Sequence, residues 1–387
     1  MARSRPHIID TTLRDGEQAP GVVFHLDDKL RIAHLLDEIG IPEVEIGTPI
    51  IGPQEVADLR VLTHAGFHFQ SLVWCRATKA DIDAAARTGA HGVNISFPVS
   101  DVHLSAMNRS HTWVLEVLHE IVDYASPHFE YLVIGAQDAS RANTPFLLEF
   151  LKNVLALNVR RVRIADTVGI LHPMSTQSLF MMLRNHFPSM SLEFHGHNDL
   201  GMAVANTISA LLSGADSASV TVNGLGERAG NAALEEVVMA LELACNVKTQ
   251  LDTSLFGNLS DIVTLASDVA NSVQKPVVGR NVFSHESGIH AHLMMKNRNT
   301  YQIIDGQNVG RGSSEFVFGK HTGSAAVEQF CLNHHIALSR DSYVPLTNAL
   351  KNRAVRLKRA LTSEEVLGEI EALTDTLPFS PAVTFQR

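Results

Sequence analysis

Cysteine is scarce in this chain of 387 residues, which has only three. They are Cys75, Cys245 and Cys331, an odd number with wide spacing and no Cys-x-x-Cys pair. This pattern argues against a disulfide framework and against a thiolate metal site. It is typical of a protein kept in a reducing compartment.

Long hydrophobic runs are also missing. No uninterrupted stretch reaches the roughly 18 apolar residues needed to cross a membrane. Arg3 and Arg5 give the start a positive charge, but no apolar segment follows them that could serve as a signal peptide. We therefore expect a soluble cytoplasmic protein without a membrane partner.

The chain also lacks an excess of basic residues. The chain has 31 Lys and Arg against 41 Asp and Glu, which gives a formal net charge of −10. Nucleic acids bind basic faces, so we expect no nucleic-acid partner. A local cluster of Arg and Lys could still bind a small anion. A hydrophobic content of 45% in a chain of this length allows one large domain plus a smaller one.

Short β-branched runs alternate with longer amphipathic segments over the first two thirds of the chain. The predicted strands are residues 7–9, 44–46, 69–73, 92–96, 131–134, 162–164, 192–194 and 218–222. Among the helices expected between and after them are residues 27–39, 144–156 and 231–244. Eight such units predict an α/β fold, the (β/α)8 or TIM barrel, over residues 1–275. An open doubly wound sheet is the alternative.

The alternation stops after about residue 275. Residues 276–387 are predicted to form a linker and a mainly helical extension, with helices near residues 324–333, 347–359 and 363–373. We expect this extension to form a dimer by packing Phe316, Val317 and Phe318 against a second copy of the chain.

Two histidines stand at the end of the predicted seventh strand. His195 and His197 are two residues apart, and side chains at i and i+2 of a strand point to the same side. Both imidazoles can therefore be aimed at one metal ion. Two solvated loop histidines are the alternative interpretation of this pair.

A charged loop follows the first strand. Residues 10–18 place Arg14, Asp15, Glu17 and Gln18 around a glycine directly after an apolar strand. The active site of a barrel gathers at the carboxyl ends of its strands, so this loop and the two histidines should meet there. A surface salt bridge to a neighbouring acid is the alternative role for Arg14.

Three motifs carry a resemblance to a known family. Residues 10–18, 195–199 and 224–232 occur in the order typical of the Claisen-condensing metalloenzymes of the isopropylmalate and homocitrate synthase family. The resemblance continues through residues 284–290 and 319–323. Within the family, residues 74–77, 97–101 and 275–279 most resemble the homocitrate synthases of nitrogen fixation.

The resemblance implies an acyltransferase that condenses acetyl-CoA with a 2-oxo acid. It implies a divalent metal ion, with Asp15, His195 and His197 as ligands and Asn231 as the fourth. Mg²⁺, Mn²⁺, Zn²⁺ and Fe²⁺ all accept such oxygen and nitrogen donors. A cap of the following helix is the alternative role for Asn231. A non-haem iron oxygenase also uses two histidines and a carboxylate, and is a competing function.

Catalytic roles follow from the same resemblance. Arg14 would face the ketone oxygen as negative charge develops there. Glu193 would lie near the metal and orient water or relay a proton. His290 and Tyr301 would reach into the neighbouring subunit's site as acid and base groups, which implies a homodimer with shared active sites. The alternative for His290 is a buried core histidine whose hydrogen-bonding groups all have partners.

Substrate binding is expected at Gln18, Arg76 and Thr167, with an ordinary turn residue as the alternative for Thr167. The chain lacks the arginine and serine that related enzymes place near Val133 and Gly135 for the distal carboxylate of 2-oxoglutarate. Arg76 is the first replacement to consider, although a role closer to the metal is equally open. We expect a homocitrate synthase acting on 2-oxoglutarate, with a 2-isopropylmalate or citramalate synthase as the alternative.

Overall fold

The computed structural model describes residues 5–313 and 315–376. The chain forms two compact units, residues 1–271 and residues 272–387. The boundary predicted from the sequence, between residues 275 and 276, lies shortly after this division. Each unit has its own secondary structure and core, and each is described by itself.

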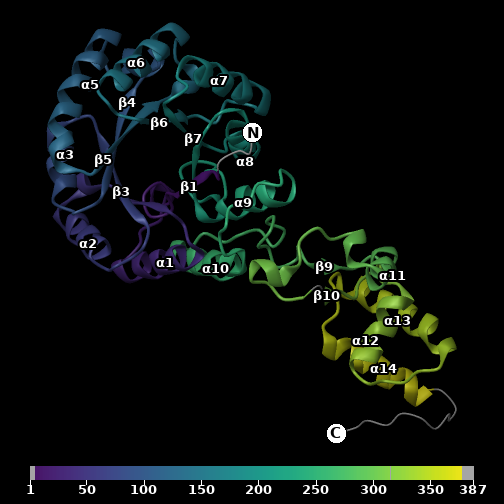
Figure 1. The fold of residues 1–387 in the computed structure, drawn as a ribbon. Coiled ribbons are helices and arrows are strands. Elements are labelled where there is room, and N and C mark those ends of the chain that lie inside the picture. The colour runs from purple at the N-terminus through teal and green to yellow at the C-terminus, as the bar shows by residue number, and fades with distance from the viewer. Residues whose placement is uncertain (1–4, 314, 377–387) are drawn as a thin grey trace. The chain divides into compact units, whose positions relative to one another are not determined.

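Eight parallel strands of the first unit close into a barrel, with helices around the outside (Figure 1). The strands are β1 (His7–Asp10), β2 (Glu43–Gly47), β3 (Gln70–Arg76), β4 (Gly92–Pro98), β5 (Tyr131–Gln137), β6 (Arg161–Asp166), β7 (Ser191–Gly196) and β8 (Ser217–Val220). Each strand pairs with the next, and β8 pairs with β1. The predicted (β/α)8 barrel is confirmed, and closure between β8 and β1 excludes the open sheet.

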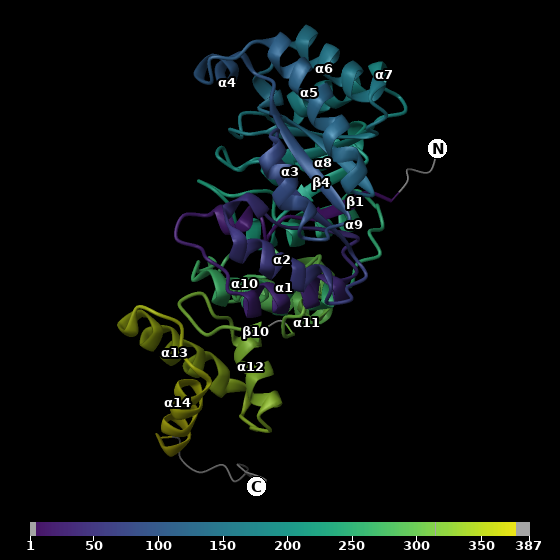
Figure 2. The same ribbon diagram turned by 90° about the vertical axis from the view of Figure 1, so that its left-hand side faces the viewer.

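The first unit contains ten helices among its described residues, and several of them can be followed across the outer wall in Figure 2. They are α1 (Leu26–Ile39), α2 (Pro53–Thr63), α3 (Lys79–Ala86), α4 (Asp101–Ala106), α5 (His111–Ala125), α6 (Thr144–Ala156), α7 (Pro173–His186), α8 (Ala203–Ser213), α9 (Leu234–Leu243) and α10 (Phe256–Ser267). No helix in the described part of the chain is long and apolar enough to cross a membrane.

Alternation within the strands separates an apolar layer from a charged interior. In β2, Val44 and Ile46 alternate with Glu43 and Glu45, and all four are buried. Successive side chains of a strand point to opposite faces, so the apolar residues pack beneath the helices and the acids point into the barrel. The acids find basic partners there from β6.

Ion pairs fill the centre of the barrel. Arg161 donates from Nη1 to Glu43 at 2.7 Å, and Arg163 donates from Nη1 to Glu45 at 3.0 Å. Arg14 donates from Nε to the same Glu45 carboxylate at 2.5 Å. Buried charges are costly unless they are paired and hydrogen-bonded, and these are. The pairing therefore links the interior strands to the loop that follows β1.

The second unit is mainly helical, as predicted. It contains the two-residue parallel pair β9 (Ser284–His285) and β10 (Glu315–Phe316), and the helices α11 (Gly288–Lys296), α12 (Ser324–Asn333), α13 (Tyr343–Leu357) and α14 (Ser363–Thr376). Phe318 is 4% exposed and belongs to this unit's own core, against which Phe316 also packs. The expectation that Phe318 packs against a second copy is therefore wrong, and the same expectation for the partly buried Phe316 and Val317 stays a prediction.

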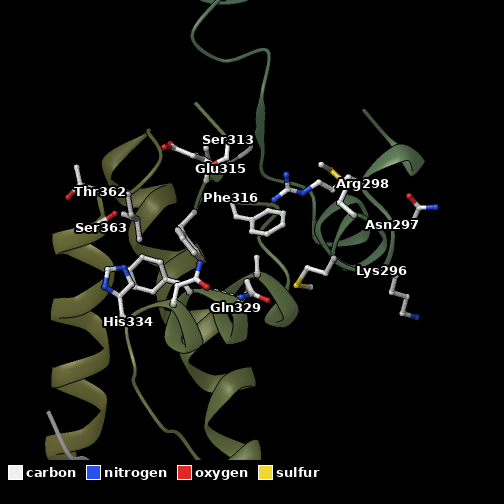
Figure 3. A pocket seen from close by; sticks show the side chains of 18 residues that line it. Lys296, Asn297, Arg298, Ser313, Glu315, Phe316, Gln329, His334, Thr362 and Ser363 are labelled. Atoms are coloured by element: carbon white, nitrogen blue, oxygen red, sulfur yellow. Dashed lines mark hydrogen bonds between the residues drawn. The ribbon is translucent and has the colours of Figure 1, made fainter. Parts of the chain in front are cut away.

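A hollow of about 930 Å³ lies in the second unit, between α11, β10, α12 and the start of α14 (Figure 3). Lys296, Arg298, Gln329 and His334 border it together with apolar side chains. None of the eleven site residues predicted from the sequence lines this hollow. Those with metal-ligating or substrate-binding expectations belong to the barrel.

Candidate active site

The loop after β1 folds back and carries Arg14 and Asp15 into the barrel mouth, the end at which the carboxyl ends of the strands lie. The backbone amide of Asp15 donates to the carbonyl of Thr11 at 2.7 Å. The hydroxyl of Thr12 accepts a hydrogen bond from the amide of Val222 at 2.8 Å, which ties the loop to the end of β8. Arg14 and Asp15 are consequently buried although they lie in a loop.

The two histidines at the end of β7 meet this loop. The Nε2 atom of His195 lies 3.1 Å from Oδ2 of Asp15 and 3.4 Å from Nε2 of His197. The potential ligand atoms of the three residues all lie within 4.8 Å of one another, and the three side chains are buried. Burial rules out two solvated loop histidines. One carboxylate and two imidazoles with this spacing could hold a divalent metal ion.

The electrostatics favour the ligating forms of Asp15 and His197. Burial alone would raise the pKa of Asp15, but the Arg14 guanidinium and the His195 imidazole outweigh it and hold that pKa well below its usual value. Burial and the neighbouring His195 lower the pKa of His197 to about 4. A carboxylate and neutral imidazoles are the forms that bind metal ions.

Asn231 lies beside the same site. It forms an isolated antiparallel bridge with His197, and its side-chain Nδ2 donates to the carbonyl of Leu225 at 3.1 Å. Its Oδ1 is buried and has no hydrogen-bond partner among the described residues. A buried acceptor of this kind fits a cation ligand. Helix α9 begins at Leu234 with Ala233 as its N-cap, so the alternative of Asn231 as a helix cap is wrong.

A cavity of about 260 Å³ contains most of the predicted site. Its described lining comprises Arg14, Asp15, Gln18, Trp74, Asn94, Ser96, Gly135, Gln137, Arg163, Ala165, Thr167, His195, His197, Glu227 and Arg228. It therefore brings Gln18 and Thr167 together with Arg14 and three of the four expected metal ligands. The hydroxyl oxygen of Thr167 accepts a hydrogen bond from the amide of Asp138 at 2.8 Å, which leaves its proton free to donate.

The structure does not support the role predicted for Arg76. This residue ends β3, does not line the cavity, and has a side chain that is 61% exposed. Its guanidinium binds Asp81 through two hydrogen bonds, each 3.0 Å long, from Nε and Nη2. Asp81 lies in the first turn of α3, whose N-cap is Thr78. The aspartate binds the arginine outside the described cavity lining, so this geometry gives no support to the predicted role at a distal carboxylate.

Glu193 lies on β7 two residues before His195, so both side chains point into the barrel. Its carboxylate is fully buried and accepts hydrogen bonds from Arg163 and from the hydroxyl of Ser219. Arg161 lies 3.5 Å from its other oxygen. Glu193 thus sits one inward position below the metal-ligand candidates, fixed by arginines.

His290 and Tyr301 belong to the second unit. Their rings stack with centroids 3.9 Å apart and an interplanar angle of 24°. Tyr301 is 44% exposed, so this pair is not part of a buried core. The exposure of Tyr301 therefore gives no support to the alternative that His290 is a buried core histidine with all its hydrogen bonds made.

Several lining residues were not identified from the sequence. Trp74 contacts Arg14, whose guanidinium carbon lies 5.8 Å from the ring centroid. Arg228 donates to both carboxylate oxygens of Asp199, at 2.8 and 3.0 Å. Arg163 is also deeply buried, at 3% exposed. Its signal in the sequence was a charged residue between the apolar Val162 and Ile164 of β6.

Two family models match the chain. Residues 5–263 match the model described as HMGL-like, and residues 277–358 match the one described as homocitrate synthase post-HMGL domain-like. Among solved structures, hydroxymethylglutaryl-CoA lyase from Pseudomonas aeruginosa has a TM-score of 0.61 and 20% identity. The match covers 70% of this chain and 95% of the lyase. At this identity the likeness concerns the fold alone.

Two curated relatives match over almost their entire length. A protein named 2-isopropylmalate synthase 2, from Caldanaerobacter subterraneus subsp. tengcongensis, is 40% identical over 362 residues, or 93% of this chain and 94% of the relative. Homocitrate synthase 1 from a Nostoc species is 39% identical over 365 residues, or 94% and 96%. The chain is therefore an acyltransferase of the isopropylmalate and homocitrate synthase family, within the wider group of HMGL-like proteins.

Proposed function

We propose that this enzyme condenses acetyl-CoA with 2-oxoglutarate and hydrolyses the resulting thioester, which yields homocitrate and CoA. The methyl carbon of the acetyl group loses a proton to a base and forms a bond to the keto carbon. The keto oxygen becomes a hydroxyl group, and water then cleaves the carbon–sulfur bond to release the CoA thiol. Each product molecule therefore accounts for one acetyl-CoA, one 2-oxo acid and one water.

One observation carries this proposal. Asp15, His195 and His197 converge with Arg14 in a buried cavity at the carboxyl ends of β1 and β7, where barrel enzymes place their chemistry. Membership of a family of acyltransferases then favours condensation over oxygenation, although an iron oxygenase uses a similar ligand set.

The residues fit a divalent metal ion. Asp15, His195 and His197 would hold it, and Asn231, whose buried Oδ1 has no described partner, would be the fourth ligand. When bound, the metal supplies a Lewis acid that polarises the ketone of the oxo acid. Oxygen and nitrogen donors do not select among Mg²⁺, Mn²⁺, Zn²⁺ and Fe²⁺.

Arg14 stabilises the oxygen of the reacting ketone in this proposal. Glu45 accepts from its Nε at 2.5 Å, and its Nη1 lies 3.3 Å from Oδ1 of Asp15. These two contacts fix the plane of the guanidinium at the cavity wall. A preorganised cation is effective because it need not reorganise as negative charge develops. Thr167 and Gln18 supply hydrogen bonds to the oxo acid.

The proton acceptor comes from a second copy of the chain in this account. His290 and its stacked neighbour Tyr301 lie in the second unit, and neither lines the barrel cavity. A homodimer that exchanges its second units would bring these groups to the partner's cavity. The resemblance of residues 284–290 to the family motif supports this assignment.

The identity of the 2-oxo acid is the most specific part of the proposal. The two curated relatives described above carry different product names at nearly equal identity, so similarity alone favours neither. The motifs at residues 74–77, 97–101 and 275–279 favour homocitrate synthase. Acetyl-CoA and 2-oxoglutarate are both metabolites of the cytoplasm, where we place the reaction.

Release of the CoA thiol from acetyl-CoA tests the proposal across a panel of 2-oxo acids with added divalent metal. We expect the highest kcat/KM with 2-oxoglutarate. The highest value with 2-oxoisovalerate would make the enzyme an isopropylmalate synthase, and with pyruvate a citramalate synthase. Thiol release with none of the acids would contradict condensation altogether. Chelation of the metal with EDTA should abolish turnover in every case.

A further inference from the structure

Arg163 occupies a middle layer of the barrel interior. Layers in such barrels are built from alternate strands, and this one contains Glu45 from β2, Asn94 from β4, Arg163 from β6 and Ser219 from β8. Arg163 is only 3% exposed, yet it lines the cavity that contains Asp15, His195 and His197. A permanent positive charge therefore lies beneath the metal-ligand candidates.

Two of the three guanidinium nitrogens of Arg163 are used within the barrel. Nε donates to Glu193, and Nη1 contacts both oxygens of Glu45 at 3.0 and 3.1 Å. The third nitrogen, Nη2, is buried and has no hydrogen-bond partner among residues 5–313 and 315–376. A buried donor left unpaired is costly, so this nitrogen calls for an acceptor from outside the protein.

The carboxylates around Arg163 are shared with other arginines. Glu45 also binds Arg14, and Glu193 is also approached by Arg161. Arg14 in turn lies beside Asp15, and Arg161 beside Glu43. None of these carboxylates accepts a hydrogen bond from Nη2 of Arg163, so this nitrogen remains a donor without a described acceptor.

Small residues leave Arg163 open to the cavity. Ala165 is the next inward residue of β6, and Gly135 of β5 is in register with Arg163. Both line the cavity. A Cβ atom on Gly135 would come within 3.1 Å of Asn94 Oδ1 and would occupy part of this space. The two small residues therefore leave this side of the cavity free of longer side chains.

The other arginines of the cavity are already engaged. Arg14 is held by Glu45 and Asp15 beside the metal-ligand candidates. Arg228 binds both oxygens of Asp199 and also donates to the carbonyl of Thr167 at 2.8 Å. Arg163 thus lines the described cavity and has one guanidinium nitrogen, itself buried, without a described acceptor.

We propose that Arg163 binds the distal carboxylate of a 2-oxodicarboxylic acid and so selects this substrate class. The inference rests on the proposed function, because it assumes that the 2-oxo end lies at Asp15, His195 and His197. A 2-oxo acid with an apolar tail would leave Nη2 unpaired and would bring carbon against a buried charge. This assigns to Arg163 the role that the sequence had suggested for Arg76.

Equilibrium binding of two acids without acetyl-CoA tests the proposal. The probes are 2-oxoglutarate and 5-methyl-2-oxohexanoate, which has an isopropyl group in place of the distal carboxylate, measured calorimetrically with saturating Mg²⁺. The wild type should bind 2-oxoglutarate at least about tenfold more tightly, as expected for hydrogen bonds to a charged group. Arg163→Gln should weaken 2-oxoglutarate by roughly 10- to 100-fold and change the apolar acid by less than about threefold.

Arg161→Gln is the matched control. Arg161 is the preceding inward arginine of β6 and also faces Glu193, but it does not line the cavity. Its replacement should alter both affinities by the same factor. If Arg163→Gln does not fold, Arg163→Lys keeps the charge, and it should reduce the preference for 2-oxoglutarate without reversing it.

Equal binding of the two acids by the wild type, or a preference unchanged in both Arg163 variants, would overturn the inference. Thiol release with 2-oxo acids could still occur in that case, and the proposed function would stand. The preference for 2-oxoglutarate could also depend on Arg163 while no acid gives thiol release. The binding inference would then hold, and the proposed condensation would fail.

Discussion

His197 and Asn231 face each other across an antiparallel bridge that joins the end of β7 to the loop after β8. The amide of Asn198 reinforces this connection by donating to the carbonyl of Gly230 at 2.9 Å. The bridge places an amide side chain beside a histidine from a different strand of the barrel. Asn231 lies outside helix α9, which begins only at Leu234, so its side chain does not cap that helix.

Replacement of Asn231 by Ala should weaken binding of a divalent metal by at least roughly tenfold, the loss seen even for outer-shell partners. The physical reason is that its buried Oδ1 is otherwise unpaired within the described chain. Metal affinity can be measured with Mn²⁺ by electron paramagnetic resonance. Asn206→Ala is the control, since this buried asparagine of α8 donates to the carbonyl of Leu171 and lies outside the cavity. Equal affinities in Asn231→Ala and the wild type would remove Asn231 from the ligand set.

Replacement of Arg76 by Ala should leave the KM for 2-oxoglutarate within about twofold of the wild type. The side chain of Arg76 is exposed, and the buried carboxylate of Asp81 keeps hydrogen bonds from the Arg76 amide and the Thr78 hydroxyl, so we expect a small loss of stability. Steady-state kinetics and a thermal unfolding curve check both expectations. A rise in KM of tenfold or more would restore Arg76 to the substrate site.

Acid should destabilise the barrel through Glu43 and Glu45. Burial alone would raise the pKa of each, but Arg161 for Glu43, and Arg14 with Arg163 for Glu45, lower both to about 2 from the ordinary value of 4.5. The unfolded chain therefore takes up protons first as the pH falls. The contribution of these two residues to the free energy of unfolding should hold above pH 4.5 and decline between pH 4.5 and pH 2.

Circular dichroism during denaturant unfolding at a series of pH values measures this decline. Glu43→Gln should lower stability at neutral pH, because Arg161 loses its main partner, and should make the acid-dependent decline shallower. A variant whose stability depends on pH as steeply as that of the wild type would show that Glu43 is not a source of the effect.

Shared active sites predict complementation between two inactive variants. Asp15→Ala removes a metal-ligand candidate from the barrel, and His290→Ala removes a proposed acid or base group from the second unit. Mixed dimers formed by subunit exchange contain one site free of both changes. Random exchange makes half of the dimers mixed, so about a quarter of the wild-type activity should return.

The recovered activity should rise with the extent of exchange, which native mass spectrometry can follow. His290→Ala mixed with the wild type is the reference for dilution alone. A mixture of the two variants that stays inactive after proven exchange would place His290 in the site of its own subunit.

The barrel was predictable because its strands are short β-branched runs separated by amphipathic helices. The convergence of Asp15 with His195 and His197 was also predictable, since strand ends meet at one mouth of a barrel. The loop after β8 was harder to predict. Thirteen residues lie between β8 and α9, and the sequence assigns the last three of them to the following helix. The bridge from Asn231 to His197 depends on a residue of another segment of the chain.

The roles of the arginines could not be obtained from the sequence. Glu45 and Arg163 are 118 positions apart, and only closure of the barrel brings β2 opposite β6. Arg76 is the opposite case, because its partner Asp81 is close in sequence, in the first turn of α3. Both cases depend on which partner is nearest in space.

Mass spectrometry of the product made from trideuterated acetyl-CoA and 2-oxoglutarate tests the central claim most directly. Formation of the carbon–carbon bond requires loss of one methyl deuteron, so the account predicts homocitrate with two deuterons, in equal amount to the CoA released. The same reaction with Asp15→Ala protein should yield neither product. Release of CoA together with trideuterated acetate, and without homocitrate, would contradict the account, because the enzyme would then hydrolyse acetyl-CoA without condensing it.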